Sequence, residues 1–146
     1  MRRLVLPLLF VLLGALGLRA QEAAPAQLSA REVRDAVRTV VNAQLDALQQ
    51  NRVEDAYAFA ARGIRRQFPA PVFAAMIRRG YPALVAHARR DLGVVRDDRA
   101  GRAFVDVTVF DAKGRAARFR YQLVLERDAW RVEGVLPLRP APRGDT

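Results

Sequence analysis

The stretch RAFVDVTVFDAKGRAARFRYQLVLERDAWRVEGVLPL, residues 102–138, decides the fold of this chain. Apolar and polar residues alternate along it in three runs, and turn-forming residues separate these runs at regular spacing. Alternation with a period of two places the apolar side chains of a strand on one face. The stretch therefore predicts three antiparallel strands joined by hairpins, with one face buried against the rest of the chain.

The second hairpin of this stretch has its register set by its turn. With Arg127-Asp128 as a two-residue loop, the flanking strands pair so that their apolar residues share one face. The pleat and the hydrophobic pattern then agree, as a buried sheet face requires. The predicted buried pairs are Leu125 with Trp130, Leu123 with Val132, Tyr121 with Gly134 and Phe119 with Leu136; the outer pairs are Val124 with Arg131 and Gln122 with Glu133.

The first hairpin admits two registers, which send Asp106 to opposite faces of the sheet. An even loop over Asp111–Gly114 places Asp106 beside Phe119 inside, whereas a three-residue loop over Ala112–Gly114 sets it against Arg120 outside. We favour the second register because a three-residue loop favours glycine at its last position, where the backbone is left-handed. In addition, a buried, unpaired carboxylate is costly. The predicted inner face is Val105, Val107, Val109, Phe119, Tyr121, Leu123, Leu125, Trp130 and Val132, with Val105 opposite Tyr121 and Val107 opposite Phe119.

Three helices are predicted before the sheet. The first begins at Ser29, which forms a capping-box pattern with Glu32, and ends near Gln50 or Asn51. The second spans residues 53–61 and is closed by Gly63. The third starts at the prolines of residues 69–71 and ends at Gly80.

An irregular strand is predicted from Ala86 to Arg96, with Gly93 marking a bulge. Tyr81-Pro82 precedes it as a turn or extended corner, after a link over residues 64–68. Residues 97–101 form a turn before the three-strand stretch.

Gln44 is a polar residue in the middle of the apolar arc of the first helix. An amide in that position needs hydrogen-bond partners. It is either a core glutamine bonded to neighbouring backbone or an amide that faces a pocket, and the sequence leaves both interpretations open.

The N-terminal residues 1–20 have the pattern of a secretory signal peptide, with Arg2 and Arg3 before an apolar run and a cleavage site near Ala20. We therefore expect a periplasmic or secreted protein. Retention of residues 4–18 as a membrane anchor is the alternative, although the run is short for a membrane span. Residues 21–28 are predicted to be a linker, residues 29–138 the domain and residues 139–146 a disordered tail.

The expected mature chain is basic. Of 25 basic residues, three lie in the predicted signal peptide, which leaves 22 against 15 acidic residues and a net charge of about +7. Outside the cytoplasm such a charge favours weak contact with anionic envelope surfaces over nucleic acid, or it reflects arginine-rich coding bias. The chain has no cysteine and one histidine, so the sequence predicts no disulfide and no metal site, and no cofactor.

Several short sequence motifs resemble those of an uncharacterised bacterial domain family. They are QLDAL at 44–48, DAYAFA at 55–60, IRRQF at 64–68, GYP at 80–82 and Trp130-Arg131-Val132 with Gly134. That family is similar to the nuclear transport factor 2-like (cystatin-like) superfamily. The resemblance implies an α+β fold in which three N-terminal helices pack on a curved antiparallel sheet of about four strands, forming a cone with a pocket.

The resemblance implies two alternative functions for such a pocket. We expect a non-catalytic module that binds a small apolar or amphipathic ligand, with Gln44, Tyr57, Phe68, Tyr81, Tyr121 and Trp130 as candidate ligand-binding residues. The alternative is an isomerase or cyclase, which uses a pocket carboxylate or histidine for proton transfer. The favoured register points Asp106 outward, and His87 is more typical of a structural histidine, so we assign no catalytic residue.

Dimerisation through the outer sheet face is also expected, because this face carries more apolar residues than a monomer favours. The apolar residues expected there are Phe104, Phe110, Val124 and Val135, accompanied by Thr108, Arg118 and Gln122. Such a homodimer is compatible with either function.

Overall fold

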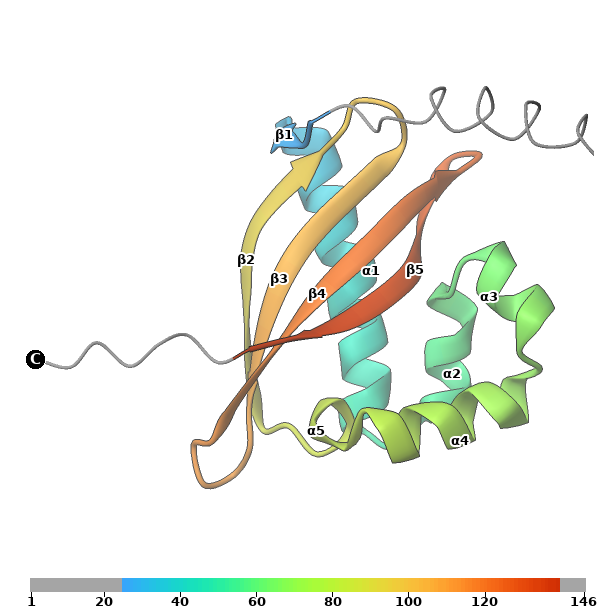
Figure 1. The fold of residues 1–146 in the computed structure, drawn as a ribbon, viewed down its shortest axis with the longest axis vertical. Helices are drawn as coiled ribbons and strands as arrows, with labels where there is room; N and C mark the ends of the chain where they lie inside the picture. The colour runs from blue at the N-terminus through green and yellow to red at the C-terminus, as the bar shows by residue number, and fades with distance from the viewer. Residues whose placement is uncertain (1–24, 140–146) are drawn as a thin grey trace, which may run out of the picture.

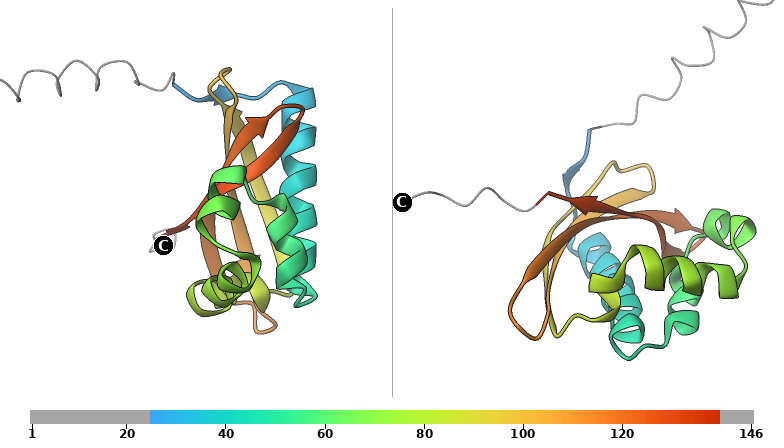
Figure 2. Two further views of the ribbon diagram at one scale, coloured as in Figure 1. Left: turned by 90° about the vertical axis from the view of Figure 1, so that its right-hand side faces the viewer. Right: turned by 60° about the horizontal axis from the view of Figure 1, so that its bottom comes forward.

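A computed structural model describes residues 25–139 (Figures 1 and 2). The predicted signal peptide, the start of the predicted linker and all but the first residue of the predicted tail lie outside the described residues. No helix within the described part is long and apolar enough to cross a membrane. The elements in chain order are β1 (Gln27–Leu28), α1 (Arg31–Gln49), α2 (Val53–Ala56), the 3-10 turn η1 (Tyr57–Phe59), α3 (Arg62–Gln67), α4 (Ala70–Gly80), α5 (Pro82–Val85), β2 (Arg89–Asp97), β3 (Arg102–Phe110), β4 (Ala116–Glu126) and β5 (Ala129–Leu138).

The strands form one antiparallel sheet in the order β1-β2-β3-β4-β5. The sheet curls around α1, and the short helices α2 to α5 gather at one end beside β5 (Figures 1 and 2). The α+β class is as expected, but the counts differ, because the described residues contain five strands and five α-helices instead of about four and three. The extra strand β1 lies at the end of the predicted linker, and two residues are too few to show strand periodicity.

Helix α1 packs its apolar arc into the hollow of the sheet. Val37, Val41, Leu45 and Leu48 are fully or almost fully buried, as the helical periodicity predicts. The predicted cap is wrong, because Ala30 occupies the N-cap position and no side chain caps the helix. Ser29 instead continues the sheet, since its backbone N–H donates to the Val95 carbonyl at 3.1 Å.

The hairpin between β3 and β4 has the predicted three-residue loop. Gly114 has a φ of +80°, and the Asp111 N–H donates to the Arg115 carbonyl to close the loop. Asp106 lies opposite Arg120 on the outer face, and its carboxylate accepts two hydrogen bonds from that guanidinium at 2.7 and 3.0 Å. The pairs Val105 with Tyr121 and Val107 with Phe119 are confirmed.

The hairpin between β4 and β5 follows the prediction only near its turn. Leu125 faces Trp130, Leu123 faces Val132 and Val124 faces Arg131, as expected. Beyond them a bulge leaves Glu133 without a partner, so the remaining predicted pairs are wrong by one residue. Tyr121 faces Val135 instead of Gly134, and Phe119 faces Pro137 instead of Leu136. Gln122 faces Gly134 instead of Glu133.

The bulge changes the predicted outer face. Val135, expected outside, pairs with the buried Tyr121 and packs on the core, while Leu136 lies half exposed opposite Arg120. The inner face is buried as predicted except for Leu125, which is 42% exposed near the sheet end. Phe104, Phe110 and Val124 remain on the outer face and are partly buried. Dimerisation through this face stays a prediction.

The segment between α1 and α4 is more broken than predicted. The second predicted helix ends early, because Ala60 is extended and forms a parallel bridge with Val132 of β5. The Ala61 N–H donates to the Val132 carbonyl at 2.8 Å, which fixes this segment to the sheet. Gly63 lies inside α3 rather than at a helix end, because α3 forms within the predicted link. Pro82 begins α5 instead of an extended corner.

Candidate functional site

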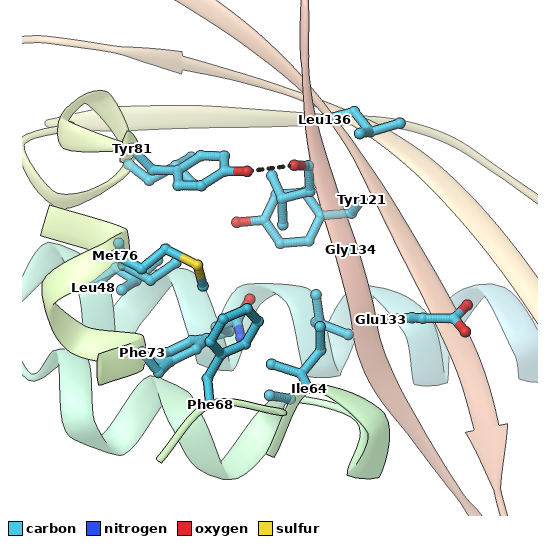
Figure 3. A pocket seen from close by; sticks show the side chains of 16 residues that line it. Leu48, Ile64, Phe68, Phe73, Met76, Tyr81, Tyr121, Glu133, Gly134 and Leu136 are labelled. Carbon is cyan, nitrogen blue, oxygen red and sulfur yellow. Dashed lines mark hydrogen bonds between the residues drawn. The ribbon is translucent and has the colours of Figure 1, made fainter. Parts of the chain in front are cut away.

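The wide end of the cone contains a cavity of about 240 Å³ (Figure 3). Helix α1 and strand β4 supply its floor with buried side chains, among them Leu48 and Tyr121. Partly exposed residues from α3 and α4, including Ile64 and Met76, form its mouth. Strand β5 forms one wall. The side chains around the cavity are almost all apolar.

Strand β5 forms this wall with five consecutive residues, Val132–Leu136. A regular strand would turn every second residue away, but the bulge at Glu133 and the position of β5 at the sheet edge bring its backbone to the cavity. The Val135 carbonyl accepts a hydrogen bond from the Tyr81 hydroxyl at 2.9 Å, which joins the α4–α5 corner to the wall (Figure 3).

Tyr121 lines the cavity, and its hydroxyl is a buried group at the cavity floor. Its residue is 0% exposed, and the hydroxyl points between Tyr81 and Met76 (Figure 3). This oxygen has no hydrogen-bond partner among the described residues. Burial raises the pKa of Tyr121 well above its ordinary value, so the phenol keeps its proton at physiological pH. The cavity floor therefore holds a covered hydrogen-bond donor with no acceptor among the described residues.

Both interpretations of Gln44 that the sequence leaves open hold in the structure. Its amide nitrogen donates to the Ala56 carbonyl at 3.1 Å, so the side chain is held by neighbouring backbone. The same side chain lines the cavity. Because the amide nitrogen is engaged with Ala56, the orientation of the amide on the cavity floor is fixed.

Four of the six predicted ligand-binding residues line the cavity, namely Gln44, Phe68, Tyr81 and Tyr121. Tyr57 does not, because its hydroxyl donates to backbone carbonyls at Arg65 and Phe68 while its ring packs on Phe73. Trp130 is a core residue outside the cavity. The prediction missed apolar lining residues that look like core residues in the sequence, such as Leu48, Phe73, Met76, Ile77 and Leu84.

No histidine or aspartate lines the cavity within the described part of the chain. The Asp106 carboxylate faces outward and is paired with Arg120. Glu133 is the acidic residue at the cavity rim, and its carboxylate points away from the other lining side chains (Figure 3). The described residues also contain no group of three acidic or histidine side chains placed to bind a metal ion.

His87 belongs to a structural cluster between α1 and β2. Its Nδ1 lies 2.6 Å from the Leu84 carbonyl, so this nitrogen carries the proton, and Nε2 faces Arg90 at 3.5 Å. Arg90 in turn binds Asn42 and Asp46 of α1 at 3.0 and 2.5 Å. Burial lowers the pKa of His87, with the nearby Arg90 charge adding to the effect. His87 is therefore a neutral side chain that joins two elements.

The sequence matches the family described as "Domain of unknown function (DUF4864)" over residues 30–144. The chain belongs to this family. The DUF4864 chain is similar in structure to Aln2 from a Streptomyces species, with a TM-score of 0.56 and 16% identity over 77% of this chain and 94% of that one. It is also similar to a domain of unknown function with a cystatin-like fold from Nostoc punctiforme, with a TM-score of 0.55 and 16% identity over 79% of this chain and 82% of that one.

No curated protein matches the DUF4864 sequence. At 16% identity the two solved structures show the fold alone. Together, the family match and the solved structures confirm the expectation of an uncharacterised family with a cystatin-like cone.

Replacement of Tyr121 by phenylalanine is expected to stabilise the empty protein. The substitution removes a buried hydroxyl without a partner, a group that costs about 1–3 kcal/mol of stability. Chemical denaturation of Tyr121→Phe should therefore give a higher free energy of unfolding than the wild-type chain. Tyr81→Phe is the matched control, and it should lower that free energy by about 1 kcal/mol because it removes the bond to Val135. Equal losses in the two variants would contradict an unpartnered Tyr121 hydroxyl.

His87 is expected to make stability depend on pH. Since the pKa of His87 is lowered in the folded state from 6.5, the unfolded chain binds a proton more readily. This contribution to stability is complete above pH 6.5, falls as the pH drops below 6.5 and levels off below the folded-state pKa. Urea denaturation between pH 8 and pH 4.5 should show this fall, and His87→Gln should flatten it. An unchanged pH profile in the variant would show that His87 is not the responsible group.

Proposed function

We propose that this chain is a non-catalytic binding module, acting in the periplasm or outside the cell, that holds a compact and largely apolar small molecule in its cone. One observation carries the proposal: Tyr121, which lines an apolar cavity, has a buried hydroxyl with no partner among the described residues. The compartment is proposed from the signal-peptide pattern of residues 1–20.

The Tyr121 hydroxyl supports ligand binding because it is costly in the empty protein. A buried hydroxyl without a partner loses its bonds to water and gains none in return. Phenylalanine would fill the same place between Val105 and Val135 at lower cost, since these cross-strand neighbours are apolar. A ligand that accepts a hydrogen bond from the Tyr121 hydroxyl removes this cost. The ligand-bound protein then has one unpaired buried polar group fewer than the empty protein.

The surroundings of the cavity favour binding over the isomerase or cyclase alternative. Proton transfer needs a base within hydrogen-bond reach of the substrate. The carboxylate at the cavity rim, Glu133, points away from the lining side chains, and His87 is held between Leu84 and Arg90 (Figure 3). What the cavity offers is apolar surface with a few polar groups that orient a ligand, an arrangement typical of small-molecule sites.

Toluene is a suitable first probe for this proposal, because an apolar cavity of about 150 Å³ already holds benzene. Met76 projects into the cavity and is the residue to enlarge, since its side chain reaches into the space between Tyr121 and Phe68 (Figure 3). We expect Met76→Trp to fill the cavity and abolish toluene binding, measured by chemical-shift titration of the isotope-labelled protein.

Val72 provides the matched control on the same helix. It is 50% exposed and lies outside the cavity lining, so Val72→Trp adds an indole to α4 without filling the cavity. Val72→Trp should bind toluene as the wild-type chain does. Failure of the wild-type chain to bind toluene, or equal binding by Met76→Trp, would overturn the proposed function.

A further inference from the structure

We infer that the ligand of this cavity is an electrically neutral molecule with a hydrogen-bond acceptor, such as a carbonyl oxygen, that receives the proton of the Tyr121 hydroxyl. This inference rests on the proposed function and assigns the ligand a chemical class.

The donor groups of the cavity show why an acceptor is required. The Tyr81 hydroxyl already donates to the Val135 carbonyl, and the Gln44 amide nitrogen donates to the Ala56 carbonyl. The Tyr121 hydroxyl is the buried donor in the lining that has no partner among the described residues, whereas the remaining polar atom of the Gln44 side chain, its amide oxygen, is an acceptor. Its pKa, raised by burial, keeps it protonated. A ligand oxygen placed beside it therefore gains a hydrogen bond that the protein itself does not supply.

The charges around the cavity show why the ligand is neutral. Among the described residues, the lining contains no arginine, lysine or histidine to pair with an anion. The ionised side chain in the lining is Glu133, which repels an anion, and Arg90, whose charge reaches the Tyr121 phenol, is outside the lining and bound to Asp46. An ammonium group has no lone pair to accept the Tyr121 proton. A carboxylate or phosphate buried here would lose its hydration without a compensating charge.

The size of the cavity limits the ligand to about one substituted ring. An apolar cavity of about 150 Å³ holds benzene, and this cavity measures about 240 Å³. The rings of Phe68 and Phe73 lie on one side of it, opposite Tyr121 (Figure 3). A flat ring with one polar substituent directed at Tyr121 fits this arrangement.

Three one-ring probes test the inference on the full chain. Acetophenone carries a carbonyl acceptor, isopropylbenzene has nearly the same shape without one, and benzoate carries a charge. Affinities are measured by ligand-observed NMR titration for the wild-type chain and for Tyr121→Phe. Tyr57→Phe is the control, because Tyr57 is not a lining residue and its hydroxyl already donates to the backbone carbonyls of Arg65 and Phe68.

We expect Tyr121→Phe to weaken acetophenone binding by about 2- to 10-fold, the worth of one neutral hydrogen bond. Isopropylbenzene should bind the variant at least as well as the wild-type chain, and Tyr57→Phe should leave both affinities unchanged. Benzoate should bind the wild-type chain more than about tenfold more weakly than acetophenone.

Two results would overturn the inference while leaving the proposed function intact. One is that Tyr121→Phe leaves acetophenone binding unchanged or weakens both neutral probes equally. The other is that benzoate binds more tightly than acetophenone. If neither acetophenone nor isopropylbenzene binds the wild-type chain, the proposed function itself fails.

Discussion

Strand β5 carries one residue more than the part of β4 that it faces, and the wall of the cavity depends on this mismatch. The extra residue, Glu133, shifts the strand so that Val135 rather than Gly134 lies opposite Tyr121. The shift also presents the Val135 carbonyl to Tyr81, which ties the α4–α5 corner to the sheet. Without the bulge, the alternation of β5 would continue and Val135 would point to the outer face.

The bulge acts together with a second connection between the helices and β5. Ala60 interrupts the helical segment to bridge Val132, directly before the bulge. Helix α2 packs on α1, whereas the segment that leads into α3 is held against the edge strand. The helical segments are attached to β5 at two places, Val132 and Val135. Both residues line the cavity, which therefore lies between the helices and the sheet.

Local signals in the sequence predict part of this structure. The β3–β4 register follows from Gly114 and from the cost of burying Asp106, so it could be derived residue by residue. The β4–β5 register could not, because Val132 and Val135 have opposite parity and either one satisfies an apolar inner face. The break at Ala60 was also missed, since it depends on a contact with a strand more than 70 residues away in sequence.

The residues of the candidate site could likewise be predicted only in part from the sequence. Gln44 is a polar residue at an apolar position, so the sequence pattern alone marks it as unusual, whereas Tyr121 follows the inner-face pattern of its strand. Phe73 and Leu48 look like core residues, since the periodicity that buries a side chain in a core also directs it into a cavity. Tyr57 and Trp130 are predicted as candidates for the pocket of the expected cone, yet local packing places both elsewhere.

The central claim is that Tyr121 directs a buried hydroxyl, without a partner among the described residues, toward the cavity of the cone. A crystal structure of the purified chain tests this claim most directly, through the electron density around the Tyr121 hydroxyl oxygen. The account predicts a cavity bounded by Met76, Tyr81 and β5, in which a bound small molecule or solvent lies within hydrogen-bond distance of that oxygen, about 2.5–3.0 Å. A collapsed cavity, with the Tyr121 hydroxyl bonded to a protein group, would contradict it.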